Sequence, residues 1–148
     1  MIVRNATKED ALQLTYLTTQ LGYQLSREEL EERIDICSNV GIYNYLVSEV
    51  NGTIVGLCVF LIYPKFYKKA NCCFLEILVV DEQFRKQGVG TKLLNNMEDV
   101  ARIKQCISIS LLSNLNRDTK IHDFYRHQGY YNEGSRAQLY LRKELQTL

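Results

Sequence analysis

Apolar positions in the first part of the chain change from a strand pattern to two helical ones. Ile2 to Ala6 is typical of a short strand. Apolar residues then recur every three to four positions over two stretches, which predicts two amphipathic helices. Each stretch opens with a pair typical of a capping box, Thr7 with Asp10 and Ser26 with Glu29. We expect the first helix to end at Gly22 and the second near residues 39–41.

A β-hairpin is predicted next. The stretches 43–50 and 53–63 are rich in aromatic and β-branched residues, and the Asn51-Gly52 pair between them favours a type I′ turn. After Pro64, a lysine-rich loop leads to a further strand, residues 72–80, which is apolar except for Glu76. Such a run is typical of a strand covered on both faces.

The centre of the chain predicts a strand, crossover helix and strand. A glycine-bearing turn at 85–90 follows the apolar strand, and apolar residues over 89–104 lie on one helical face. Residues 106–112 are again typical of a strand. This order predicts a right-handed unit whose two strands are parallel.

The C-terminal part predicts one short helix and two final strands. Asp118 or Thr119 would cap the helix, and Gly129 would follow its end. We expect residues 130–133 and 138–142 to pair as antiparallel strands. The whole pattern indicates the α/β (α+β) class.

Length and charge narrow the range of partners. A chain of 148 residues has room for one globular domain. The net charge of +1 predicts neither a nucleic-acid nor a membrane partner, so any charge-driven partner must be met locally. The longest apolar stretch is too short to span a bilayer, and charges near the N-terminus interrupt any signal-peptide core. We therefore expect a cytoplasmic protein.

The cysteines predict neither disulfides nor a metal site. The chain has five of them, with no C-x-x-C pair, and all lie in predicted helices or strands. Without a local base they are more typical of small apolar core residues than of nucleophiles.

The glycine turn is a candidate anion site. It joins the end of an apolar strand to a helix N-terminus, where backbone N–H groups and the helix dipole favour phosphate. A Walker A loop is excluded because Thr91 precedes Lys92, and a dinucleotide fingerprint is excluded because Leu93 stands at its third glycine. Chain geometry alone would be the simpler explanation of this turn.

Two motifs favour the functional interpretation. The string from Arg85 to Gly90, RKQGVG, matches R-x-x-G-x-G, and the segment from His122 to Tyr130 resembles H-x-F-Y-x-x-x-G-F/Y. With the order of elements along the whole chain, they resemble the GNAT (GCN5-related N-acetyltransferase) superfamily. The resemblance implies one domain over residues 1–148, with a mixed sheet of about six to seven strands, about four flanking helices and a splayed parallel strand pair.

The resemblance also implies acetyl-CoA as co-substrate, with no metal. The backbone of the first parallel strand would hold the pantetheine arm, the amides of the turn would hold the pyrophosphate, and a loop asparagine and a helix tyrosine would complete the site. The implied residues are Leu78, Val79, Val80, Arg85, Lys86, Gln87, Gly88, Val89, Gly90, Thr91, Asn116 and Tyr125.

Catalytic roles follow from the same resemblance. Tyr125 would be the general acid that protonates the departing thiolate, since an ordinary phenol is protonated at neutral pH. Glu76 would be the base, with burial raising its pKa, although Ile77 stands where the family often has a second acid. The alternatives are a core tyrosine and a structural ion pair. His122 is a further candidate, because it matches a histidine variant of the family motif, whereas His127 is typical of a surface residue near a helix end.

Of the predicted reaction, the acceptor substrate is what the sequence determines least. The resemblance directs attention to the loops Leu21–Gln24 and Gly134–Arg136, and several tyrosines suggest aromatic walls with hydroxyl groups. Those near the predicted openings are Tyr23, Tyr43, Tyr45, Tyr63, Tyr67 and Tyr131. We expect a small-molecule or amino-acid-like amine. A protein N-terminus or lysine, and a non-catalytic acyl-CoA-binding module, are the alternatives, and a homodimer is left open.

Overall fold

The computed structural model describes residues 1–113 and 119–132, which belong to two compact units. The first unit, Met1–Leu112, contains a five-stranded sheet with the helices α1, α2 and α3. The second, Ser113–Leu148, contains α4 (Thr119–His127).

The sheet has the strand order β1-β2-β3-β4-β5. The pairs β1–β2, β2–β3 and β3–β4 are antiparallel. The pair β4–β5 is parallel, as the sequence predicts. The strands are β1 (Ile2–Asn5), β2 (Tyr43–Val50), β3 (Thr53–Pro64), β4 (Asn71–Val80) and β5 (Cys106–Leu111).

The predicted count of six to seven strands is not matched. The described residues form five strands, and residues 130–132, predicted as the start of a sixth, are irregular. The seventh, 138–142, lies outside the described residues.

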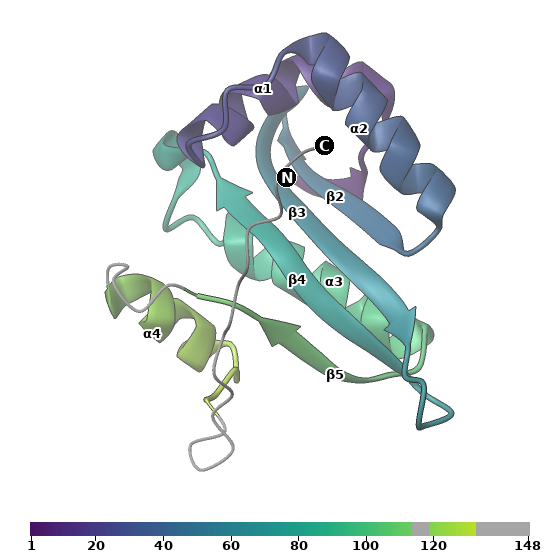
Figure 1. Ribbon diagram of the computed structural model, residues 1–148. Helices are drawn as coiled ribbons and strands as arrows, with labels where there is room; N and C mark the ends of the chain where they lie inside the picture. The colour runs from purple at the N-terminus through teal and green to yellow at the C-terminus, as the bar shows by residue number, and fades with distance from the viewer. Residues whose placement is uncertain (114–118, 133–148) are drawn as a thin grey trace, which may run out of the picture. The chain divides into compact units, whose positions relative to one another are not determined.

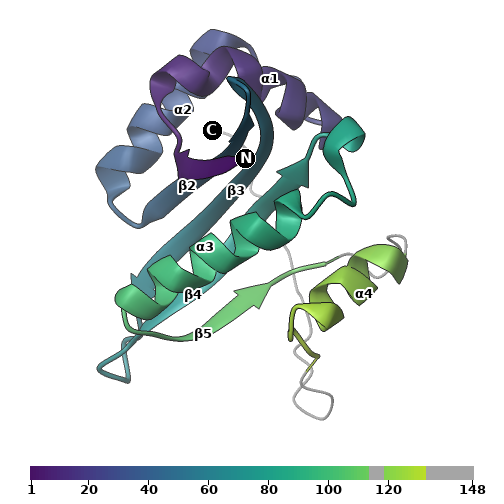
Figure 2. The same ribbon diagram turned by 180° about the vertical axis from the view of Figure 1, so that it is seen from behind.

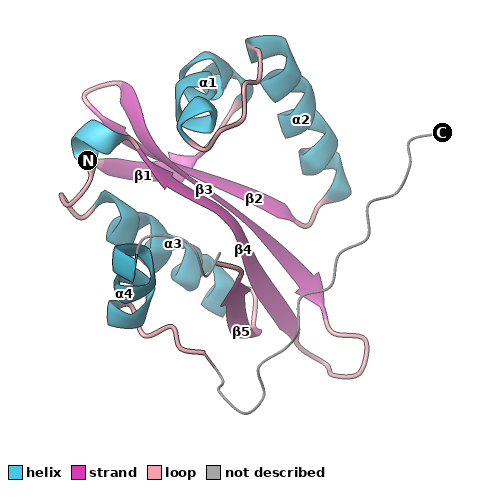
Figure 3. Ribbon diagram, turned by 60° about the vertical axis from the view of Figure 1, so that its left-hand side comes forward, coloured by secondary structure: helices cyan, strands magenta, loops and turns pink. Residues whose placement is uncertain are grey.

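The helices cover both faces of the sheet. α1 and α2 lie on one face and α3 lies on the other (Figures 1, 2 and 3). The helical elements of this unit are η1 (Lys8–Asp10), α1 (Ala11–Gln20), α2 (Arg27–Val40), η2 (Glu82–Phe84) and α3 (Val89–Ile103). The predicted capping box of α2 is confirmed, because the Ser26 hydroxyl accepts the Glu29 N–H at 3.1 Å and the Glu29 carboxylate accepts the Ser26 N–H at 2.7 Å.

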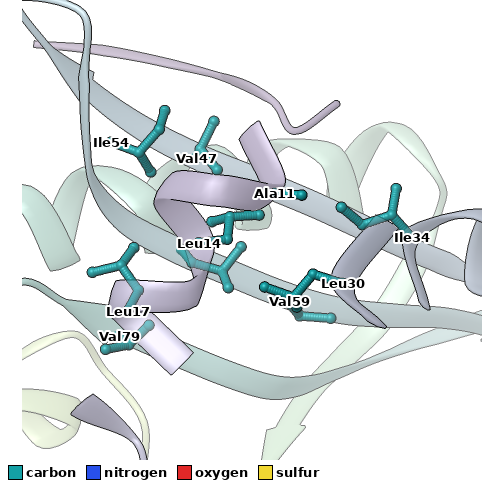
Figure 4. Packing of buried hydrophobic residues seen from close by; sticks show 10 residues of the cluster. Ala11, Leu14, Leu17, Leu30, Ile34, Val47, Ile54, Val59 and Val79 are labelled. Carbon is teal, nitrogen blue, oxygen red and sulfur yellow. The ribbon is translucent and has the colours of Figure 1, made fainter. Parts of the chain in front are cut away.

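One hydrophobic core lies between the sheet and the α1–α2 pair. Leu14 and Leu17 of α1 point toward Val59 and Val79 of the sheet (Figure 4). The cluster is completed by Ala11, Leu30, Ile34, Val47, Ile54 and Leu57. Because Val79 belongs to this core, the C-terminal half of β4 is fixed beneath α1.

Gly56 allows α3 to approach the opposite face closely. A Cβ at this position would lie 2.9 Å from Leu93 Cδ1 and 3.0 Å from Val89 Cγ1, which is closer than packed carbon atoms allow. Any larger residue at position 56 would therefore displace the N-terminal turn of α3. The glycine fixes where that helix begins relative to β4.

Candidate functional site

The parallel strands β4 and β5 separate halfway along β4. Their pairing begins at Asn71 with Cys106 and ends at Leu75 with Leu111. Beyond Leu75, no described residue pairs with β4 on the β5 side, and the two strands diverge (Figures 1 and 2). The predicted splayed pair is present, and it leaves a strand edge open.

A β-bulge coincides with the point of separation. β3 residues Val59 and Phe60 pair with Ile77 and Leu75 of β4, so Glu76 is an extra residue without a partner in the register. A bulge bends its strand and increases the local twist. We infer that the extra residue turns the end of β4 away from β5.

Leu78 and Val80 direct their backbone groups to the open edge. Asp81 N–H donates to Val55 O of β3 at 2.9 Å, so Asp81 faces β3. Backbone groups alternate along a strand, which directs Val79 toward β3 and Leu78 and Val80 away from it. The Val80 carbonyl indeed accepts a bond from outside the sheet, from Arg85 Nε at 3.1 Å. Of the three predicted strand residues, two therefore line the edge.

The glycine turn continues directly from this edge. It contains two residues in the left-handed region, Lys86 at φ 60° and Gly88 at φ 80°. A Cβ built at Gly88 meets no heavy atom within 4 Å, so the space beside it is open. A ligand could approach the backbone there.

The N-terminus of α3 presents donors next to that space. The Lys92 N–H donates to Gly88 O at 2.9 Å as the helix begins. The N–H groups of Val89 and Gly90 precede it and have no acceptor inside the helix. Together with the helix dipole, they form a site suited to an anion.

The Arg85 side chain turns back toward the protein instead of projecting from the turn. Besides its bond to Val80 O, it donates from Nη2 to Gln20 Oε1 at 3.4 Å. The same Gln20 oxygen accepts the Glu82 N–H at 3.2 Å. Gln20 is the last residue of α1, and its side chain thus connects α1 to both ends of η2. The sequence motifs do not predict this role.

We predict that Gln20→Ala weakens the binding of acetyl-CoA, the co-substrate that the family resemblance implies, roughly tenfold, because it removes two hydrogen bonds that hold the turn. Gln20→Glu keeps oxygen acceptors at the same place and should bind almost as the wild type does. Titration calorimetry with acetyl-CoA measures both.

Gln13→Ala is the matched control. Gln13 belongs to the same helix and also makes two hydrogen bonds, to Gly52 O and from Ile54 N–H, but to the β2–β3 turn. If Gln13→Ala weakens binding as much as Gln20→Ala, the effect comes from general destabilisation and the positioning role of Gln20 is wrong.

Glu76 is exposed, so the expectation that its side chain is buried is wrong. The bulge accounts for the difference, because the extra residue does not pack as a regular strand residue does. The Glu76 carboxylate does raise the pKa of Tyr43, since its negative charge disfavours the phenolate. A base at this position would act from solvent contact and not from a dry pocket.

Two predicted pocket tyrosines lie side by side on β2. The rings of Tyr43 and Tyr45 stack with centroids 6.2 Å apart. Burial, followed by the neighbouring Cys37, raises the pKa of Tyr45. Both rings pack against the hydrophobic core between the sheet and the α1–α2 pair. Their position is therefore explained by core packing as well as by the predicted pocket.

α4 carries the predicted acid and histidines. The Tyr125 ring is half-buried and meets Phe124 and Tyr130 edge to face, with centroids 5.3 Å and 5.8 Å away. His122 is half-buried, and the exposed His127 ring lies 2.6 Å from Asp123 O through Nδ1. Gly129 at φ 86° follows the helix as predicted.

The first unit therefore unites the strand edge with the residues from Arg85 to Thr91, whereas Tyr125 belongs to the second unit. Asn116 and the Gly134–Arg136 loop lie outside the described residues. Burial raises the pKa of Cys73 to about 12 and also raises that of Cys58, which disfavours either thiolate as a nucleophile.

Within 1–113 and 119–132, no group of three or more His, Cys, Asp or Glu side chains could hold a metal ion. None of the helices there combines the length and the apolar content needed to cross a membrane.

Comparisons with known proteins agree with this geometry. Residues 10–130 match the family model of the acetyltransferase (GNAT) family. A chain of Agrobacterium tumefaciens str. C58, described as an acetyltransferase, superposes with a TM-score of 0.87 at 22% identity, covering 97% of this chain and 100% of that one.

Two further structures have the same fold. Glucosamine-6-phosphate N-acetyltransferase of Arabidopsis thaliana has a TM-score of 0.80 at 22% identity, with 98% of each chain covered. An aminoglycoside 6'-N-acetyltransferase of Acinetobacter haemolyticus has a TM-score of 0.78 at 17% identity, covering 99% of this chain and 100% of that one.

Proposed function

The chain belongs to the acetyltransferase (GNAT) family, whose members are acyltransferases that use acetyl-CoA, and from this premise we propose that it acetylates a primary amine of a small molecule. In this proposal residues 1–148 act as one domain and transfer the acetyl group directly.

The observation that carries the proposal is the open edge of β4 beside the α3 N-terminus. Leu78 and Val80 offer backbone groups to an extended amide-containing arm, as a neighbouring strand would. Val80 O already accepts Arg85 Nε, but a carbonyl oxygen has a second lone pair. The open space at Gly88 and the donors of Val89 and Gly90 suit a pyrophosphate. The residues present therefore fit coenzyme A.

The chemistry requires a neutral amine and a protonated leaving group. At pH 7 less than about one alkyl amine in a thousand is neutral, so a base assists. In our proposal Glu76 accepts the amine proton through water, and the amine nitrogen attacks the thioester carbonyl carbon. As the carbon–sulfur bond breaks, the Tyr125 hydroxyl gives its proton to the thiolate.

The small-molecule acceptor has support from the comparisons. Two structures of the same fold are named for acetylation of glucosamine 6-phosphate and of aminoglycosides, both amine-bearing sugars. At sequence identities of 22% and 17%, these similarities show a shared fold but do not show a shared substrate. An amine screen that detects thiol release tests the substrate class.

We predict that acetyl-CoA stabilises the folded protein by about 2.7 kcal/mol at a hundred times its dissociation constant. The reason is that the strand edge and the helix N-terminus exist together only in the native state. Thermal melting with and without acetyl-CoA measures the effect, and ATP is the control for unspecific phosphate binding.

Three outcomes separate the candidate functions. Turnover with amine metabolites supports the proposal, and mass shifts confined to peptide arrays indicate a protein acetyltransferase. Stabilisation by acetyl-CoA without turnover on either panel indicates a non-catalytic acyl-CoA-binding module. An unchanged melting temperature at millimolar acetyl-CoA would contradict the assignment of acetyl-CoA as the co-substrate.

A further inference from the structure

The loop between β3 and β4 exposes two aromatic rings at the tip of a hairpin. Phe66 is 105% exposed and Tyr67 is 73% exposed. The loop is held in shape by backbone bonds, including Lys65 N–H to Ala70 O at 2.9 Å. In Figures 1 and 3 it extends beyond the end of the sheet. A fully exposed phenylalanine gains nothing from the fold, so its apolar surface is available to a partner.

The same tip is strongly basic. Lys65, Lys68 and Lys69 lie within it, and no acidic residue occurs between Glu49 and Glu76. Among the described residues, none of the ion pairs involves Lys68 or Lys69. Lys65 Nζ lies 5.5 Å from the centre of the Tyr67 ring, which leaves that ring partly covered. The local positive charge is therefore not neutralised, although the whole chain has a net charge of only +1.

A small pocket adjoins the two free lysines. It has a volume of about 240 Å³ and is lined by Pro64, Lys68, Lys69, Ala70, Asn71 and Gln105. That volume is several times the space of a water molecule, so a phosphate group fits. Aromatic rings and a cationic pocket therefore occur together at one tip.

We propose that this hairpin tip binds the surface of a bilayer containing anionic phospholipids. Phe66 enters the boundary between headgroups and acyl chains, Tyr67 remains at the interface, and Lys68 and Lys69 bind lipid phosphates. The overall net charge predicts no membrane partner, and the proposal departs from that expectation because the charge is concentrated locally.

The shape of the tip favours a bilayer over other macromolecules. A single loop of six residues, 65–70, cannot supply the roughly 800 Å² per partner of a stable protein interface. Single-stranded nucleic acid needs a groove that follows its backbone and successive rings on which bases stack. This tip instead projects beyond the end of the sheet, and of its two rings only Phe66 is uncovered, because Lys65 lies over Tyr67. A bilayer requires only an apolar anchor and nearby cations.

Sedimentation of the full chain with vesicles tests the proposal. We expect binding to vesicles of equal parts phosphatidylglycerol and phosphatidylcholine, and at most weak binding to phosphatidylcholine alone. Lys68→Glu with Lys69→Glu should lower partitioning at least about twentyfold. Phe66→Ser should lower it about tenfold, and the binding that remains should be lost in high salt.

The controls change matched residues elsewhere. Leu12→Ser removes another exposed apolar side chain, on α1. Arg33→Glu reverses another exposed charge, on α2. Each should partition as the wild type does, and melting curves should show all variants folded. Equal binding by the lysine variant and the wild type overturns the proposal. An absence of binding to anionic vesicles also overturns the proposal, whether or not the protein is retained on single-stranded RNA. The measurement uses no acetyl-CoA, so its failure leaves the proposed function unaffected.

Discussion

Replacing Tyr125 with phenylalanine is expected to lower turnover roughly 10² to 10⁴-fold, the usual range for a lost general acid. The ring contacts with Phe124 and Tyr130 would remain, so the melting temperature and acetyl-CoA affinity should change little. Steady-state kinetics with an acceptor from the amine screen, together with melting curves, measures both.

The pH profile gives a second test of the same role. If the phenol must be protonated, wild-type kcat should decline at alkaline pH, and Tyr125→Phe should lose that limb. Tyr130→Phe is the matched control, because the motif accepts either aromatic residue at that position. Full activity of Tyr125→Phe with an unchanged alkaline limb would mean that solvent protonates the thiolate.

Local sequence signals predict most of the first unit. The Asn51-Gly52 pair adopts left-handed conformations at φ 50° and 81°, as the predicted type I′ turn requires. Gly41 ends α2 at φ 76°, at the end of the predicted range. These signals succeed because each depends on the conformation of one or two residues and not on distant partners.

The features that sequence reasoning missed depend on tertiary contacts. The bulge at Glu76 arises from the register between β3 and β4, so the residue that reads as a lone charge in a buried strand is exposed. Gln20 meets Glu82 and Arg85 across more than sixty positions of the chain, and no local pattern marks it. Gly56 reads as an interruption of an apolar run, yet it decides how closely α3 packs.

The second large effect is expected from Gly88→Val, which should weaken acetyl-CoA binding about a hundredfold or more. The branched side chain would occupy the open space beside the α3 N-terminus and block the backbone donors, whose bonds to charged groups are the stronger ones. Valine is also strained at φ 80°, so the variant should be less stable by about 2 kcal/mol. Calorimetric titration and melting curves separate the two effects.

Gly41→Val supplies the matched comparison for that strain. Gly41 has φ 76° and, like Gly88, no heavy atom within 4 Å of an added Cβ, but it lies at the end of α2. It should lose similar stability and keep its acetyl-CoA affinity. Gly90→Val adds the same side chain inside α3, where a helical backbone accepts valine with little strain, and should also bind poorly. If both Gly88→Val and Gly90→Val fold and bind acetyl-CoA normally, the pyrophosphate is held elsewhere. The glycines would then serve only the turn into the helix.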